Sequence, residues 1–254
     1  MTNITAALVK ELREKTGVGM LACKKALTES TGNVEQAIEI LRKRGEAKAS
    51  EKNSRSTNEG IIAIKNKVII KLLCETDFVA KNEKFIAFGQ ALADKANQDG
   101  EKAAYDFFES QKSDQIQAIG ENINLVDVKI IEGGDMVSGY VHSNKKLGCI
   151  VSLDGGTEEQ AKDVAMHAVA MNPEVCNPED VSSELIEKEK EIYQEQLKKE
   201  GKPEQIMEKI IDGKIKKFCA ERALTSQPFV KDPSVTVAKY LGNAKLINFI
   251  RMSI

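Results

Sequence analysis

The feature that most constrains the fold is a pattern that occurs twice along this 254-residue chain. Two short apolar runs flank a polar turn, which is the pattern of a β-hairpin, and an amphipathic helical pattern follows. The second copy begins 79 positions after the first, with Gly139 at the place of Gly60. We interpret the pattern as a structural duplication of a hairpin-plus-helix unit. The predicted strands are residues 61–64, 68–74, 139–142 and 147–153, and the helical patterns cover residues 82–97 and 157–171.

The turn after the second strand of the first copy carries an aromatic residue beside a carboxylate. Phe78 follows Asp77 where the strand pattern gives way to a helical one, in a chain with eight Phe and no Trp. An aromatic side chain at such a place either packs beneath the turn as a plug or is presented to a partner. These residues alone leave both interpretations open.

The N-terminal segment predicts a small helical domain. Between residues 4 and 45, glycines separate three short amphipathic patterns, and Gly17 suits the left-handed conformation that ends a helix. Gly45 is predicted to end the third helix. Residues 46–58 are rich in lysine and serine and hold almost no large apolar side chain, which indicates a linker or a frayed helix.

The C-terminal part predicts a further helical element. Residues 182–220 hold many charges and a narrow apolar seam, broken at Gly201-Lys202-Pro203, which is the pattern of an antiparallel helical hairpin. The hairpin either packs only on itself or serves as a partner contact, including a homodimer contact, and both uses stay open. The tail predicts a short helix that begins at Val235 and a strand over residues 246–250.

These patterns together predict an α+β fold in which antiparallel hairpins pack against helices. We divide the chain into three parts. They are residues 1–52, a three-helix domain with its linker; residues 53–138, the first core subdomain; and residues 139–254, the second core subdomain, which includes the helical hairpin 182–220 and a C-terminal module 228–254.

Composition excludes several classes of protein. The formal net charge is −2, whereas a non-specific nucleic-acid binder is expected to carry a basic excess. The sequence has no apolar run of about 18 residues that would span a membrane. It also lacks the charged and apolar N-terminal regions of a secretory signal. Five scattered cysteines suit reduced thiols better than disulfides, so we expect a cytoplasmic protein.

Residues typical of catalysis do not gather in any motif. The two histidines, His142 and His167, have no cysteine or carboxylate neighbours at the spacing of metal ligands. The glycine pairs at 133–134 and 155–156 lack the Lys-Ser/Thr ending of a phosphate-binding loop. We therefore predict a protein that is not an enzyme and that carries no metal or cofactor.

Two motifs resemble those of a known family. The first covers residues 12–27, LREKTGVGMLACKKAL, and the second covers residues 74–82, CETDFVAKN. Both are similar to the signatures of bacterial elongation factor Ts, the guanine-nucleotide exchange factor for elongation factor Tu. Further matches, in the family's order, make the resemblance cover essentially the whole chain. They lie at residues 120–124, 165–168, 201–203 and 224–230.

The resemblance implies a fold and a partner-binding surface. It implies an N-terminal domain of the ubiquitin-associated (UBA) type, a two-subdomain core with an internal repeat, and a protruding helical hairpin. In the family, the aspartate and phenylalanine of the second motif are pushed into the GTPase near its nucleotide and Mg²⁺ site. By match, the residues expected to contact elongation factor Tu are Arg13, Met20, Leu21, Thr76, Asp77, Phe78, Val79 and His142.

Some of these residues have another explanation. Without the resemblance, Met20 and Leu21 are as well explained by packing in the core of the three-helix domain. His167 has no matching role, and we expect it to be a satisfied packing residue.

The function that the resemblance implies is nucleotide exchange in translation, without direct nucleotide binding. The chain is expected to bind elongation factor Tu·GDP and to promote GDP release by distorting the nucleotide and Mg²⁺ site, so that GTP rebinds. Longer family members continue past the segment matching residues 248–252 with a further partner-contacting helix, and this sequence stops at Ile254. Partner contacts made by that helix in longer members are therefore not assigned to this sequence, and its affinity for elongation factor Tu is expected to be weaker.

A second class of function is a non-enzymatic RNA- or ribosome-binding adaptor. Lys24, Lys25 and the basic residues between 42 and 52 favour it. The basic stretch is more typical of a solvated helix end and linker. The acidic balance and the lack of basic strands interleaved with aromatic residues count against RNA. We expect no membrane partner and no sequence-specific nucleic-acid partner.

Overall fold

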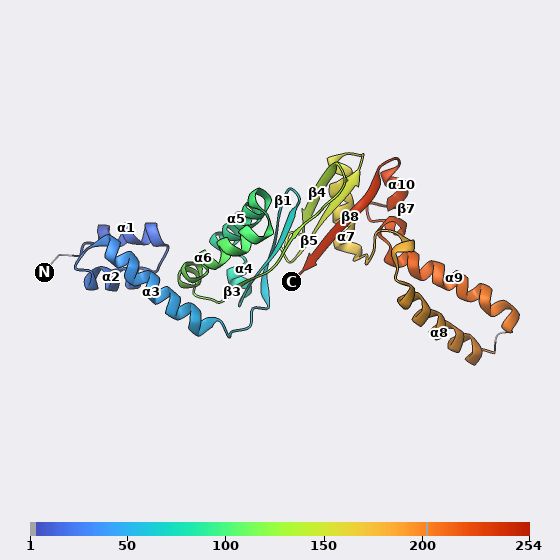
Figure 1. The fold of residues 1–254 in the computed structure, drawn as a ribbon, viewed down its shortest axis with the longest axis horizontal. Coiled ribbons are helices and arrows are strands. Elements are labelled where there is room, and N and C mark those ends of the chain that lie inside the picture. Colours follow the sequence, from blue (N-terminus) through green and yellow to red (C-terminus); the bar gives the residue numbers. More distant parts are fainter. Residues whose placement is uncertain (1–3, 202) are drawn as a thin grey trace. The chain divides into compact units, whose positions relative to one another are not determined.

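The computed structural model describes residues 4–201 and 203–254, with the backbone alone for residues 46–50. The predicted break at Gly201-Lys202-Pro203 and the first three residues of the N-terminus therefore fall outside the described residues in part or in full. By internal packing the chain divides into two compact units. One runs to Ile130 and includes Ser253–Ile254, and the other is Ile131–Met252. Figure 1 shows the elements of each unit. Within the described residues, no helix has the length and apolar character needed to cross a membrane.

Three helices form the N-terminal part of the first unit. Gly17 ends the first of them with a φ of 70°, as predicted from its freedom in the left-handed region. Leu12, Leu27 and Leu41 are contributed by one helix each and are buried together in a small core. The helices are α1 (Ala6–Thr16), α2 (Met20–Glu29) and α3 (Val34–Lys52).

A three-stranded antiparallel sheet lies in the same unit, in the order β1-β2-β3. Lys65 pairs with Val68 across a two-residue turn, so the first predicted hairpin is confirmed. Two helices cover one face of the sheet (Figure 1), and Ile70, Phe85 and Leu92 are buried between them and the strands. The elements are β1 (Glu59–Lys65), β2 (Val68–Cys74), β3 (Ile123–Ile130), the four-residue helix α4 (Asp77–Ala80), α5 (Glu83–Asp99) and α6 (Glu101–Ile119).

Helix α3 continues past its predicted end at Gly45 to Lys52. The prediction was wrong because Gly45 has a packing role. A Cβ at Gly45 would lie 2.7 Å from Oε1 of Gln117 and 3.4 Å from the carbonyl oxygen of Ser113, both on α6. The missing side chain therefore lets α3 approach α6 closely. That contact offsets the destabilisation from a glycine inside a helix, about 0.5–1 kcal/mol relative to alanine.

The second unit repeats the hairpin-plus-helix arrangement. Its antiparallel hairpin is β4 (Met136–Val141) and β5 (Leu147–Asp154), and α7 (Glu158–Met171) follows and packs on it. The sheet is completed by β8 (Lys245–Ser253), in the order β4-β5-β8. In both sheets the second strand of the hairpin is central and gains a third strand from a later part of the chain. The predicted duplication is confirmed.

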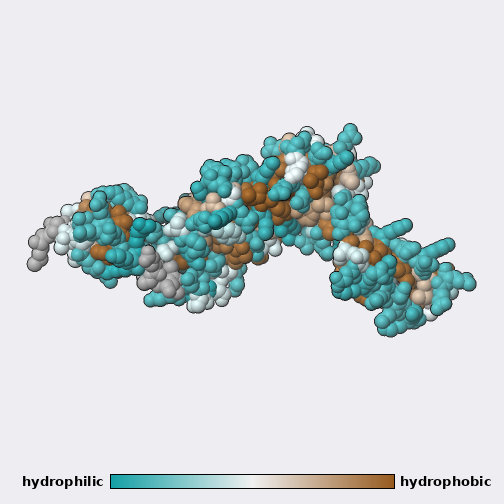
Figure 2. Space-filling model, viewed as in Figure 1, coloured by the Kyte–Doolittle hydropathy of each residue, from teal (hydrophilic) through white to brown (hydrophobic). Residues whose placement is uncertain are grey.

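The predicted helical hairpin is formed by α8 (Ser183–Lys199) and α9 (Glu204–Arg222). Leu197, Met207 and Ile211 are buried in its seam. Figure 2 shows mainly hydrophilic residues on the outer edges of these two helices, with hydrophobic residues gathered between them. The pair therefore has a narrow core of its own and a solvated outer surface.

The tail contains short elements that the sequence predicted only in part. Val235 lies in β7 (Asp232–Thr236), so the helix predicted to begin there begins two residues later, as α10 (Val237–Leu241). The reason is the cap, because the hydroxyl of Thr236 accepts a hydrogen bond from the N–H of Lys239 at 3.3 Å. β7 pairs with β6 (Pro228–Phe229). The fold class is α+β, as predicted.

Candidate functional site

The turn between β2 and α4 presents the aromatic residue singled out in the sequence. The hydroxyl of Thr76 accepts a hydrogen bond from the N–H of Val79 at 3.4 Å and caps the start of α4. The side chain of Phe78 is 82% exposed. Phe78 therefore does not plug the space beneath the turn, and its ring is open to solvent.

The other residues of α4 hold the turn to the body of the unit. Ala80 is buried in the core between the sheet and its helices, and the half-buried side chain of Val79 packs against that core. Asp77 accepts a hydrogen bond from Nζ of Lys81 at 2.7 Å. This hydrogen bond and the negative charge of Asp77 raise the pKa of Lys81. Phe78 is thus the exposed residue of α4.

A clasp of two glutamates anchors the base of the turn, and the sequence analysis gave these side chains no role. The carboxylate of Glu121 accepts hydrogen bonds from the N–H of Glu75 (3.1 Å), the N–H of Thr76 (3.0 Å) and the hydroxyl of Thr76 (2.6 Å). In return, the carboxylate of Glu75 accepts the N–H of Asn122 at 2.6 Å and lies 3.5 Å from Nη1 of Arg55. The only sequence signal was the presence of both glutamates in matched motifs.

The first matched motif places two exposed apolar side chains on the first turn of α2. Leu21 is 70% exposed and Met20 is 42% exposed, so neither is a core residue of the three-helix domain. Arg13 is exposed in the last turn of α1, whose end at Gly17 leads into α2. Arg13 thus lies on α1, and Met20 and Leu21 lie on α2, whereas residues 76–79 lie together on the turn after β2.

The two histidines have different surroundings, both within the second unit. His142 is exposed and directly follows β4, so it lies in the hairpin turn and not on the strand as predicted; its Nδ1 lies 3.2 Å from the hydroxyl of Tyr140. The ring of His167 is fully buried on α7. It contacts the side chain of Gln227 at 3.0 Å through Nε2 and the N–H of Val230 at 3.1 Å through Nδ1. His167 is therefore a satisfied packing residue, as expected.

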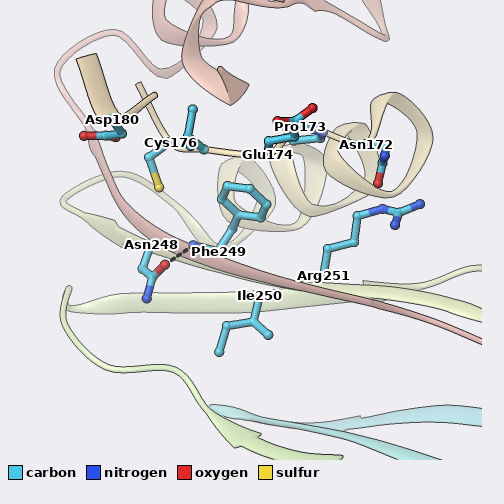
Figure 3. Close-up of a pocket in the computed structure, with 10 residues that line it drawn as sticks. Asn172, Pro173, Glu174, Cys176, Asp180, Asn248, Phe249, Ile250 and Arg251 are labelled. Carbon is cyan, nitrogen blue, oxygen red and sulfur yellow. Dashed lines mark hydrogen bonds between the residues drawn. The ribbon is translucent and has the colours of Figure 1, made fainter. Parts of the chain in front are cut away.

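A groove of about 530 Å³ runs beside β8 in the second unit (Figure 3). Phe249 and Arg251 point from β8 toward the segment 172–176, and Ile250 points away from it. Burial raises the pKa of the neighbouring thiol of Cys149 to about 12 and also raises the pKa of Cys176. Both thiols are thus protonated at neutral pH and are poor nucleophiles. Among the described residues, no three His, Cys, Asp or Glu side chains gather as metal ligands would.

Comparisons with known proteins agree with the two matched motifs. A family model described as Elongation factor TS matches residues 75–254. The chain is 47% identical over 271 residues to Elongation factor Ts of Aeromonas salmonicida, with coverage of 100% of this chain and 92% of that protein. It is 43% identical over 266 residues to Elongation factor Ts of Idiomarina loihiensis, with coverage of 99% and 91%. The chain therefore belongs to the elongation factor Ts family of bacterial translation elongation factors.

Proposed function

We propose that the chain binds elongation factor Tu in its GDP-bound form and promotes release of the GDP, so that GTP rebinds. Membership of the family supports the choice of partner. The observation that carries the proposal is the 82% exposure of Phe78 on the short helix α4. The hydroxyl of Thr76 at the start of that helix donates a hydrogen bond to Glu121 and accepts one from the N–H of Val79. Phe78 enters a pocket of the partner near its nucleotide and Mg²⁺ site and distorts that site.

The energy available from Phe78 matches this task. Burial of a phenylalanine side chain contributes about 1.5–3 kcal/mol. Because about 1.4 kcal/mol changes a rate tenfold, insertion of this one ring accounts for an acceleration of about ten- to one-hundredfold. The ring is already exposed, so no core contact of the exchange factor is broken when it moves into the partner.

The mechanism is thermodynamic linkage and needs no reactive group. If the chain binds nucleotide-free elongation factor Tu more tightly than the GDP-bound form, GDP must bind the complex more weakly by the same factor. We therefore propose a non-enzymatic exchange factor that does not itself bind nucleotide and that acts in the cytoplasm.

The remaining matched residues supply docking contacts in this proposal. Leu21 and Met20 offer exposed apolar side chains on α2, and Arg13 offers an exposed positive charge on α1. Asp77 orients the turn, and His142 adds a polar contact from the second unit. Such contacts raise affinity for the partner, whereas Phe78 changes the affinity of the partner for GDP.

Stopped-flow release of a fluorescent GDP analogue from elongation factor Tu tests the proposal. We expect the release rate to rise with the concentration of the chain and then to saturate, which gives the affinity. A folded chain that leaves the rate unchanged would contradict the proposal. Salt-sensitive retention of RNA by the same sample would then favour the adaptor function.

A further inference from the structure

The exposed ring of Phe78 depends on its backbone for its direction. An 82% exposed side chain gains little orientation from packing. Helix α4 has only four residues, and a helix of one turn is not stable by itself because nucleation of a helix is unfavourable. The direction of Phe78 is therefore set by the groups that fix the two ends of this turn.

Thr76 holds the start of α4 through its hydrogen bonds to Glu121 and Val79. Its hydroxyl has a single hydrogen, which it donates to Oε1 of Glu121 at 2.6 Å. The oxygen lone pairs are thereby left to accept the N–H of Val79 at 3.4 Å, which is the capping bond of α4. Glu121 also accepts the backbone N–H of Thr76. One carboxylate thus orients both hydrogen-bond donors of the capping residue.

Glu121 is itself held in place by the end of α6 and by Glu75. Gly120 ends α6 with a φ of 90°, a conformation that favours glycine, and the next residue is directed toward the turn. The N–H of Asn122 donates to Glu75, so the segments around residues 75 and 121 are tied in both directions. Arg55 adds a positive charge beside Glu75.

We propose that Glu121 is a positioning residue for exchange, which orders the cap of α4 and so presents Phe78 in a binding-ready direction. This role rests on the proposed function of the chain as an exchange factor. Glu121 acts through Thr76 and needs no contact with the partner. Because the turn is ordered before association, its conformational entropy is not lost during the encounter.

The test is Glu121→Gln, which keeps the size of the side chain and replaces one acceptor oxygen with an NH₂ donor. A donor facing Thr76 removes the acceptor of the hydroxyl hydrogen, so the hydroxyl rotates and its lone pairs are no longer held toward the N–H of Val79. We expect about a tenfold fall in the second-order rate of GDP release, since hydrogen bonds to charged groups are the strong ones. Glu109→Gln, an exposed glutamate on α6, is the matched control and should match the wild type.

A double-mutant cycle separates positioning from a general structural effect. If Glu121 acts through Phe78, the Glu121→Gln change should have no further effect on exchange in a Phe78→Ala background. Hydrogen exchange should show lost protection at the N–H of Val79, which makes the capping bond, with Leu72 in β2 unchanged. Full additivity in the cycle, or unchanged exchange kinetics in Glu121→Gln, would overturn the role.

Two further outcomes are informative. If Glu121→Gln does not fold, Thr76→Val removes the same hydroxyl link from the other side and should give the same loss of rate and the same non-additivity with Phe78→Ala. If the wild-type chain fails to accelerate GDP release, the proposed function fails and this role fails with it. Acceleration by the wild type, with a slow Phe78→Ala and a normal Glu121→Gln, removes only the role of Glu121.

Discussion

The two copies of the hairpin-plus-helix unit differ most at the turn after their central strands. Both turns lead to a threonine that caps the next helix, Thr76 after β2 and Thr157 after β5. At Thr157 the cap closes locally, because the side chain of Gln160 accepts the N–H of Thr157 at 3.0 Å. After Thr76 the third helical residue is Val79, whose side chain has no hydrogen-bond acceptor. The N–H of Thr76 therefore donates to the carboxylate of Glu121, 45 positions away.

This difference separates a turn that closes a core from a turn that presents a side chain. In the second copy, Gln160 also donates to the carbonyl oxygens of Tyr240 and Leu241, so the cap is tied to the body of its own unit. Helix α7 then begins at once. The first copy inserts the four-residue helix α4 and leaves Phe78 exposed before its long helix begins. Changes at the first turn should therefore affect exchange, and changes at the second should affect stability.

The largest expected effect is that of Phe78→Ala on exchange. We expect the stopped-flow rate of GDP release to fall by about ten- to one-hundredfold, from the burial energy of the lost ring. The unfolding midpoint should stay unchanged, because the ring is exposed in the free chain. Met171→Ala removes another exposed apolar side chain, on α7, and should leave exchange intact. A Phe78→Ala variant with a normal release rate would remove the distinction between the two turns.

The opposite result is expected for Gln160→Ala. This change removes the partner of the Thr157 N–H and the two bonds to the segment around Tyr240. Loss of a capping partner and of two partly buried hydrogen bonds should lower the free energy of unfolding by about 1–2 kcal/mol. Urea unfolding followed by tyrosine fluorescence measures it, with Gln205→Ala, exposed on α9, as the control. If GDP release were slower with folded Gln160→Ala than with the wild type, the turn at Thr157 would also affect exchange, which would contradict its assignment to stability alone.

The sequence predicted the elements of both copies better than the contacts of the turn. The hairpins, their following helices and the end of α1 at Gly17 depend on local patterns, which is why they were predicted. The exposure of Phe78 depends on whether tertiary structure leaves room beneath the turn, and the local pattern did not decide it. The clasp by Glu121 requires β3 to lie beside β2, and this pairing joins residues far apart in the sequence. The predicted helix end at Gly45 was wrong for the same reason, because the residues that it contacts, Ser113 and Gln117, belong to a helix far away in the sequence.

The smallest expected effect concerns the pH dependence of the second unit, in which His167 on α7 is buried. Its Nδ1 accepts the N–H of Val230, so the neutral ring carries its proton on Nε2 and donates it to Gln227. Burial lowers the pKa of His167 below its ordinary value of 6.5, although the hydrogen bond with Gln227 opposes this shift. A second proton would also face the N–H of Val230. Nearby Asp163, one turn earlier on α7, is engaged by Lys231 at 2.6 Å.

The sign of this effect follows from the lowered pKa. Because the unfolded chain binds the proton more readily than the folded chain, stability is greatest above pH 6.5 and falls as the pH drops through that value toward the folded-state pKa. We expect His167→Asn, whose amide still accepts from Val230, to be less stable at pH 7.5 and to lose less stability between pH 7.5 and 5 than the wild type. His142→Asn, at the exposed hairpin turn, should retain the wild-type slope. Equal slopes in wild type and His167→Asn would show that protonation of this ring does not oppose folding, and the second copy would then tolerate a buried charge beside the segment that closes its core.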